Sequence, residues 1–132
     1  MNHLKIKKLI KTIFKNFNLS NRHAKISAEY LIKAELFGAP SHGLARLKMY
    51  CERLDRKIIN PNPKIKIKKI SQSISHIDAN NSIGFVAADL GIKVAIKNAK
   101  KTGIGLVAIK NSGHYGLSSF YAEQAVKKNL MV

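Results

Sequence analysis

The segment Asn60-Pro61-Asn62-Pro63 constrains the fold of this chain more than any other feature. Asparagine and proline are typical of turns and connectors, and proline cannot donate a backbone hydrogen bond. The pattern of apolar residues also changes there: helical spacing precedes the segment, and strict alternation follows it over residues 64–68. We therefore predict an α/β class protein with a helical region over residues 1–60 and an α/β domain over residues 61–132.

Three helices are predicted before this connector. The first covers residues 5–17, where apolar side chains recur at helical spacing. Ser20 is suited to cap a second helix over residues 20–37, which ends where a glycine and a proline follow. Ser41 is expected to cap a third helix over residues 43–56.

Strands are predicted over residues 64–68, 74–78 and 104–110, and helices over residues 84–101 and 118–129. The lysines of the first strand are expected on the solvated face of an edge strand, with its isoleucines on the buried face. The almost continuous apolar run of the third strand predicts a position inside the sheet. One face of the helix over residues 84–101 is apolar, with Ala88, Ile92, Ala95, Ile96 and Ala99.

Turn residues separate these elements. Asn80-Asn81-Ser82 is expected to form a turn, and Gly103 to end the long helix. The chain stops at Leu130-Met131-Val132, which has the apolar character of another buried strand. We therefore expect an incomplete α/β domain, and the N-terminal part of a longer protein.

The composition is that of a globular chain in a reducing compartment. Its 132 residues suffice for about one domain with a modest core, and 45% of them are hydrophobic. Cys51 is the single cysteine, so an internal disulfide is excluded. No apolar run approaches the roughly 18–20 residues of a membrane span. We predict a cytoplasmic protein without membrane association, while the basic first helix leaves a membrane-surface or targeting role as an alternative.

The formal net charge of +17 raises the alternative of a basic nucleic-acid-binding module. The charge is mostly lysine and is spread along the whole chain. Isoleucine and asparagine are abundant as well, and all three residues share A/T-rich codons, so base bias explains the charge without a nucleic-acid function. Only 7% of residues are aromatic, which is few for base stacking. No nucleic-acid partner is predicted.

Two short segments carry the candidate chemistry. One is Ser41-His42-Gly43 with Arg46 three residues later, and the other, over residues 111–116, contains His114. Each places a histidine beside a glycine at the junction of two elements, where a ligand can approach the backbone. Histidine is the usual proton acceptor for a hydroxyl group, and the planar arginine fork fits a carboxylate. This combination suits a 2-hydroxy or 2-oxo acid.

Each of these residues also has a purely structural interpretation. His42 could bond a neighbouring loop, His114 could pack on a nearby tyrosine, and Arg46 could form an ion pair with Glu35 or Glu52. If His42 lies in the first turn of the third helix, Arg46 faces the same way.

Two other motifs are set aside. Residues 103–108 match G-x-G-x-x-A, but these glycines follow a predicted helix and open a strand, the reverse of the dinucleotide fingerprint. The five histidines show no paired ligand spacing and the acidic residues are few, so no metal site is predicted.

The run Ala-Glu-Leu-Phe-Gly-Ala-Pro-Ser-His-Gly-Leu-Ala-Arg, residues 34–46, resembles the signature of the malate/L-lactate dehydrogenase family that lacks a Rossmann fold. Further matches follow in the same order and cover essentially the whole chain: Tyr50, residues 59–61, Ile77-Asp78, Gly84, residues 103–105, residues 111–116 and Tyr121-Ala122. Ser119 departs from the family pattern, where many relatives have glycine.

The resemblance implies a helical region followed by an unusual, non-Rossmann nicotinamide-binding domain, and a homodimer. It implies hydride transfer between NAD or NADP and a 2-hydroxy/2-oxo acid, with His114 or His42 as the acid/base residue. Arg46 would hold the substrate carboxylate and Ser41 would line the same pocket. Most cofactor-binding residues would lie beyond Val132. An inactive truncated gene product remains an alternative, and the substrate and the choice between NAD and NADP stay open.

Overall fold

The computed structural model describes residues 2–132, which form five α-helices, two short 3-10 helices and a three-stranded sheet. The chain divides into two compact units, one ending at Asn62 and the other beginning at Pro63. The division falls inside the asparagine–proline connector. No helix within residues 2–132 is both long and apolar enough to cross a membrane.

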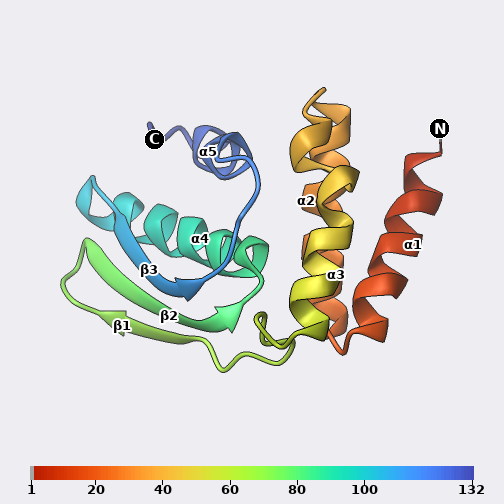
Figure 1. The fold of residues 1–132 in the computed structure, drawn as a ribbon. Coiled ribbons are helices and arrows are strands. Elements are labelled where there is room, and N and C mark those ends of the chain that lie inside the picture. The colour runs from red at the N-terminus through yellow and green to blue at the C-terminus, as the bar shows by residue number, and fades with distance from the viewer. Residues whose placement is uncertain (1) are drawn as a thin grey trace. The chain divides into compact units, whose positions relative to one another are not determined.

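The first unit is helical. It contains α1 (His3–Asn16), α2 (Asn21–Leu36), the 3-10 helices η1 (Pro40–His42) and η2 (Leu44–Arg46), and α3 (Leu47–Asp55). Ser20 caps α2 as predicted, because its Oγ accepts a hydrogen bond from the His23 N–H at 3.2 Å. α1 packs against α2 (Figure 1).

The core of this unit consists of apolar side chains at helical spacing. Ile10 and Phe14 of α1, Leu31 of α2 and Tyr50 of α3 are almost completely buried. Each buried side chain of this size contributes roughly 1.5–3 kcal/mol of transfer free energy. Burial therefore holds together helices that would be marginal alone.

The second unit combines a small sheet with two helices. Its elements are β1 (Lys66–Lys69), β2 (Ile74–Ser82), α4 (Gly84–Thr102), β3 (Leu106–Ser112) and α5 (Ser119–Val126). β1 pairs antiparallel with β2, and β2 pairs parallel with β3. Parallel strands need a long connection, and α4 supplies it while covering one face of the sheet (Figure 1).

The core of the second unit lies between β2 and α4. Alternate residues of β2, namely Ser75, Ile77 and Ala79, are buried. Ser75 is not left unpaired, because its Oγ accepts a hydrogen bond from Asn98 Nδ2 of α4 at 3.2 Å. Phe85 at the start of α4 is buried as well.

Several predicted details of the strands are wrong. β3 was expected inside the sheet, but within residues 2–132 it pairs only with β2, and most of its side chains are exposed. Ile67 of β1 was expected to be buried and is 50% exposed, because α4 covers β2 and β3 rather than β1. Both edges of the sheet are therefore open.

The ends of three predicted elements also differ. Asn80-Asn81-Ser82 continues β2 instead of turning; Asn80 and Asn81 adopt φ of 50° and 57°, and the pairing register shifts there. α5 ends at Val126, and the final segment Leu130-Met131-Val132 forms no strand. The apolar face of α4 is half-exposed.

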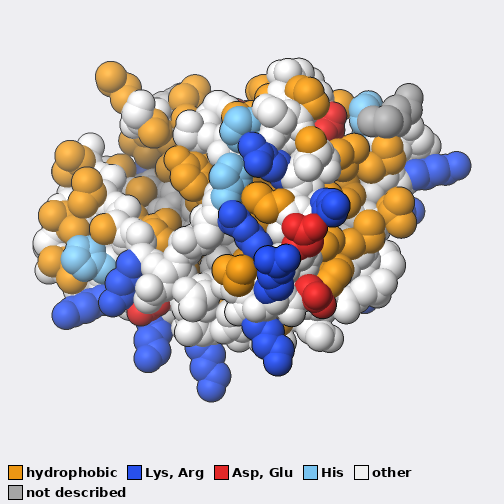
Figure 2. Space-filling view, viewed as in Figure 1, with side chains coloured by type: hydrophobic (Ala, Val, Ile, Leu, Met, Phe, Trp, Pro, Cys, Tyr) orange, Lys and Arg blue, Asp and Glu red, His pale blue; other side chains and the backbone are white. Residues whose placement is uncertain are grey.

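The lysines of β1 lie on the surface, as predicted. Lys66 and Lys68 are exposed and stand opposite Asp78 and His76 of β2. Figure 2 shows basic side chains projecting from the lower left of the molecule, where Figure 1 places β1. Such lysines discourage pairing of this edge with another strand.

Candidate active site

The Ser41 loop consists of two consecutive 3-10 turns between α2 and α3. The predicted helix over residues 43–56 begins only at Leu47, and Ser41 does not cap it but lies within η1. Gly43 separates the two turns with φ −98° and ψ −130°, a conformation that no helix continues through. The loop therefore presents its polar residues outside regular helix geometry.

Glu35 of α2 anchors this loop. Its Oε1 accepts a hydrogen bond from the Leu44 N–H at 2.6 Å. A Cβ atom at position 43 would overlap the Glu35 carboxylate, so a larger residue there would require that carboxylate to move. Glu35 thus positions the Ser-His-Gly segment through its bond to the Leu44 N–H, rather than through the ion pair with Arg46 that the sequence had suggested.

The structure brings Ser41, His42 and Arg46 together. Arg46 Nε donates a hydrogen bond to the Ser41 carbonyl oxygen at 2.8 Å, and Ser41 Oγ lies 3.1 Å from His42 Nδ1. The sequence predicted that these residues share one face of a helix. They instead come together across the two 3-10 turns. Because Nε is engaged, a carboxylate would be held by the two terminal nitrogens of the guanidinium.

His114 lies in the loop that follows the carboxyl end of β3, within the second unit. In open α/β sheets, ligands gather at this end of the strands. Asn111, the penultimate residue of β3, has a left-handed φ of 53°. Asn111 Nδ2 donates to Asp78 Oδ1 at 3.0 Å and so joins the ends of β2 and β3. This bond, followed by one from the Asn80 N–H, lowers the pKa of Asp78.

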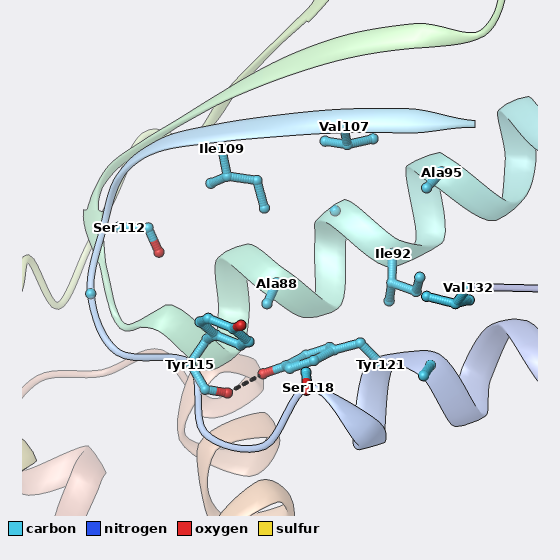
Figure 3. Close-up of a pocket in the computed structure, with 13 residues that line it drawn as sticks. Ala88, Ile92, Ala95, Val107, Ile109, Ser112, Tyr115, Ser118, Tyr121 and Val132 are labelled. Atoms are coloured by element: carbon cyan, nitrogen blue, oxygen red, sulfur yellow. Dashed lines mark hydrogen bonds between the residues drawn. The ribbon is translucent and has the colours of Figure 1, made fainter. Parts of the chain in front are cut away.

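Backbone contacts hold the His114 loop in place. A Cβ atom at Gly84 would overlap the carbonyl oxygens of Gly113 and His114, so the loop lies directly against the first turn of α4. Gly116 has φ +81°, and its N–H donates to His114 Nδ1 at 3.3 Å. The Tyr121 hydroxyl donates to the Tyr115 carbonyl oxygen (Figure 3).

A cavity of about 490 Å³ lies beside this loop. Its walls are small and aliphatic side chains of α4 and β3, and Tyr115 and Tyr121 lie together at one end (Figure 3). The two rings are 5.7 Å apart and tilted by 53°. Ser112 and Ser118 add hydroxyl groups to the lining. The cavity combines apolar walls with a few polar groups, which is typical of small-molecule sites.

Gly103 ends α4 with φ +83°, and the G-x-G-x-x-A match therefore runs from helix into strand. Within residues 2–132, no three histidine, cysteine, aspartate or glutamate residues are grouped so that they could hold a metal ion.

Three residues that position the two loops were named from the sequence as part of the family pattern, but this role was not predicted for them. Glu35, Asp78 and Tyr121 act through hydrogen bonds to residues six, nine or 33 positions away in the sequence. No local pattern marks such pairs. Gly84 was taken only as a helix start, although a glycine at a helix start is a signal of close backbone approach.

Known proteins match this chain over its full length. A family model described as malate/L-lactate dehydrogenase matches residues 1–132. L-sulfolactate dehydrogenase of Methanocaldococcus jannaschii is 38% identical over 125 residues, which are 95% of this chain and 36% of that protein. Malate dehydrogenase of Pyrococcus abyssi is 42% identical over 108 residues, covering 82% of this chain and 30% of that protein.

The fold matches as well. The solved structure of malate dehydrogenase from Pyrococcus horikoshii OT3 superposes with a TM-score of 0.92 at 35% identity, covering 96% of this chain and 36% of that one. The chain therefore spans about a third of the length of the relatives it matches.

Proposed function

Because the chain belongs to the malate/L-lactate dehydrogenase family, we propose that it supplies part of the active site of a nicotinamide-dependent oxidoreductase acting on a 2-hydroxy/2-oxo acid. The observation that carries this proposal is the Ser41 loop, where an arginine, a histidine and a serine hydroxyl are held together. Arg46 binds the substrate carboxylate and Ser41 lines the same pocket.

The residues present suit the proton and carboxylate requirements of such a reaction. Oxidising an alcohol requires a base to take the hydroxyl proton as hydride leaves carbon, and an imidazole within hydrogen-bond reach can accept it. His114 and His42 are the two candidates. In reduction the same group returns the proton to the oxygen.

A nicotinamide cofactor, NAD or NADP, would carry the hydride when bound. The residues present fit this role, because a histidine supplies the proton partner that hydride transfer needs. A homodimer and a cytoplasmic location remain predictions, the first from the family resemblance and the second from composition.

Acid binding tests the proposal directly. Titration of the ¹⁵N-labelled chain with malate or sulfolactate is expected to shift the amide resonances of residues 41–46. Arg46→Gln should weaken binding at least tenfold, because a hydrogen bond to a charged group contributes about 1.5–3 kcal/mol.

Arg56→Gln is the matched control, since Arg56 is an exposed arginine of the same unit that closes α3. Equal affinities of the two variants, or no shifts in the wild-type chain, would contradict the proposal. A nicotinamide absorbance assay with the same acids tests hydride transfer itself.

A further inference from the structure

We propose that Tyr121 is a positioning residue for His114, acting through the peptide group between Tyr115 and Gly116 to hold the proton of the neutral imidazole on Nε2. Tyr121 lies on α5 and His114 in the preceding loop. The inference deepens the proposed function and rests on it for its chemical consequence, although the arrangement itself is a property of the second unit alone.

The two hydrogen bonds belong to one planar unit. The Tyr121 hydroxyl donates to the Tyr115 carbonyl oxygen, and the N–H of the same peptide group, that of Gly116, donates to His114 Nδ1 at 3.3 Å. In a trans peptide the C=O and N–H point in opposite directions from one rigid plane. The Tyr121 hydroxyl is therefore bonded to the carbonyl side of this peptide plane, and the His114 imidazole is bonded to its N–H side.

This geometry also strengthens the second bond. A donor on the carbonyl oxygen polarises the amide, so its N–H becomes a better donor, as in other hydrogen-bonded chains. The Tyr121 hydroxyl thus both orients and polarises the group that bonds His114.

The surroundings limit other orientations of this peptide. Gly116 adopts φ +81°, and a Cβ atom there would meet the Phe85 ring at 2.8 Å. Gly84 brings α4 directly against the backbone of Gly113 and His114. Tyr121 itself is 7% exposed, so its hydroxyl bond is largely shielded from water.

The tautomer follows from the donor. A nitrogen that accepts a hydrogen bond from a backbone N–H carries no proton, so the neutral ring has its proton on Nε2. In this form Nε2 donates a hydrogen bond to the carbonyl oxygen of a 2-oxo acid and cannot itself accept the hydroxyl proton, so the proton-acceptor role in oxidation goes to His42.

The tautomer is measurable in the 132-residue chain without substrate. Long-range ¹H–¹⁵N spectra of the histidine rings, recorded above the pH at which His114 loses its charge, distinguish protonated from unprotonated ring nitrogens. We expect the Nε2–H form of His114 to exceed the Nδ1–H form at least fivefold, the bias that one ordinary hydrogen bond supplies.

Tyr121→Phe should reduce this ratio at least twofold, because the ring stays and the hydroxyl is lost. Tyr115→Phe is the matched control: it removes a hydroxyl from the same ring pair and keeps the backbone carbonyl, so the ratio should not change. An Nδ1–H form in the wild-type chain, or the same ratio in both variants, would overturn the proposal.

If Tyr121→Phe does not fold, the wild-type tautomer decides the matter alone. If the wild-type chain binds no acid but His114 has its proton on Nε2, the proposed function is wrong and the positioning role of Tyr121 stands. If the chain binds acid but His114 has its proton on Nδ1, only the positioning role is wrong.

Discussion

At the scale of single residues, Asp78 and Asn111 show how a loop is attached to a sheet. Asp78 ends the regular pairing of β2 and accepts hydrogen bonds from Asn111 Nδ2 and from the Asn80 N–H, each at 3.0 Å. Lys110 Nζ lies 3.6 Å from the other carboxylate oxygen. These contacts stabilise the ionised carboxylate and lower its pKa, with the Asn111 bond contributing most.

Removing the Asn111 side chain should raise the pKa of Asp78 toward its ordinary value. Asn111→Gly is the suitable change, because glycine tolerates the left-handed backbone that alanine would strain. Lys110→Gln is the control and should raise the pKa less. Carboxyl ¹³C titration by NMR measures both, and a larger effect of Lys110→Gln would contradict this assignment.

The lowered pKa of Asp78 determines how this residue's contribution to stability changes with pH. Because the pKa of Asp78 is lower in the folded chain, its contribution to stability is present above the ordinary value of 3.8 and is lost as the pH falls through the folded pKa.

At the scale of elements, β3 is the clearest departure from prediction. Its sequence is apolar enough for an interior strand, yet Leu106 is 54% exposed and one edge of the strand pairs with nothing among residues 2–132. An open apolar edge is a template for pairing with other chains. β1, at the other edge, carries lysines instead.

We expect the chain to aggregate through β3 at high concentration. Leu106→Lys should raise the concentration at which aggregation begins severalfold, because a charge on the edge opposes strand pairing. Ile67→Lys on β1 is the matched control, since Ile67 is equally apolar and 50% exposed. Light scattering over a concentration series measures both, and an equal effect of the two changes would argue against β3 as the contact.

At the scale of the whole molecule, each unit has a core of its own. Phe14, Leu31 and Tyr50 are buried in the first unit, and Ile77, Phe85 and Phe120 in the second. Burial of side chains within each unit therefore contributes to the stability of that unit.

Phe14→Ala should lower the free energy of unfolding by about 3–5 kcal/mol, the usual cost of removing a buried phenylalanine. Hydrogen exchange should show the loss of protection concentrated at residues up to 62. Leu9→Ala is the control on the same helix, where Leu9 is 60% exposed and the cost should be below about 1 kcal/mol. Similar costs for the two changes would mean that Phe14 does not carry the packing assigned to it.

Periodicity was sufficient to locate most elements of this molecule. α1, α2 and α4 lie close to their predicted ranges, and Ser20 and Gly103 cap as their residue types indicated. The third helix is present but begins four residues later than predicted, because the backbone at Gly43 is not helical and the Glu35 carboxylate, eight positions away, packs against it. The turn predicted at residues 80–82 is absent, and β2 continues through them instead. Asn80 and Asn81 adopt left-handed backbone conformations within the strand.

By itself, the sequence determined the order of helices and strands and the family, and it predicted which residues could bind an acid or move a proton. Local spacing and residue type are enough for these, because they depend on groups near one another along the chain. Only the tertiary structure decided that Arg46 bonds the Ser41 carbonyl and that Tyr121 and Gly116 orient His114. Those bonds depend on where the backbone folds back on itself, and a hydrogen bond reports distance in space rather than separation in sequence.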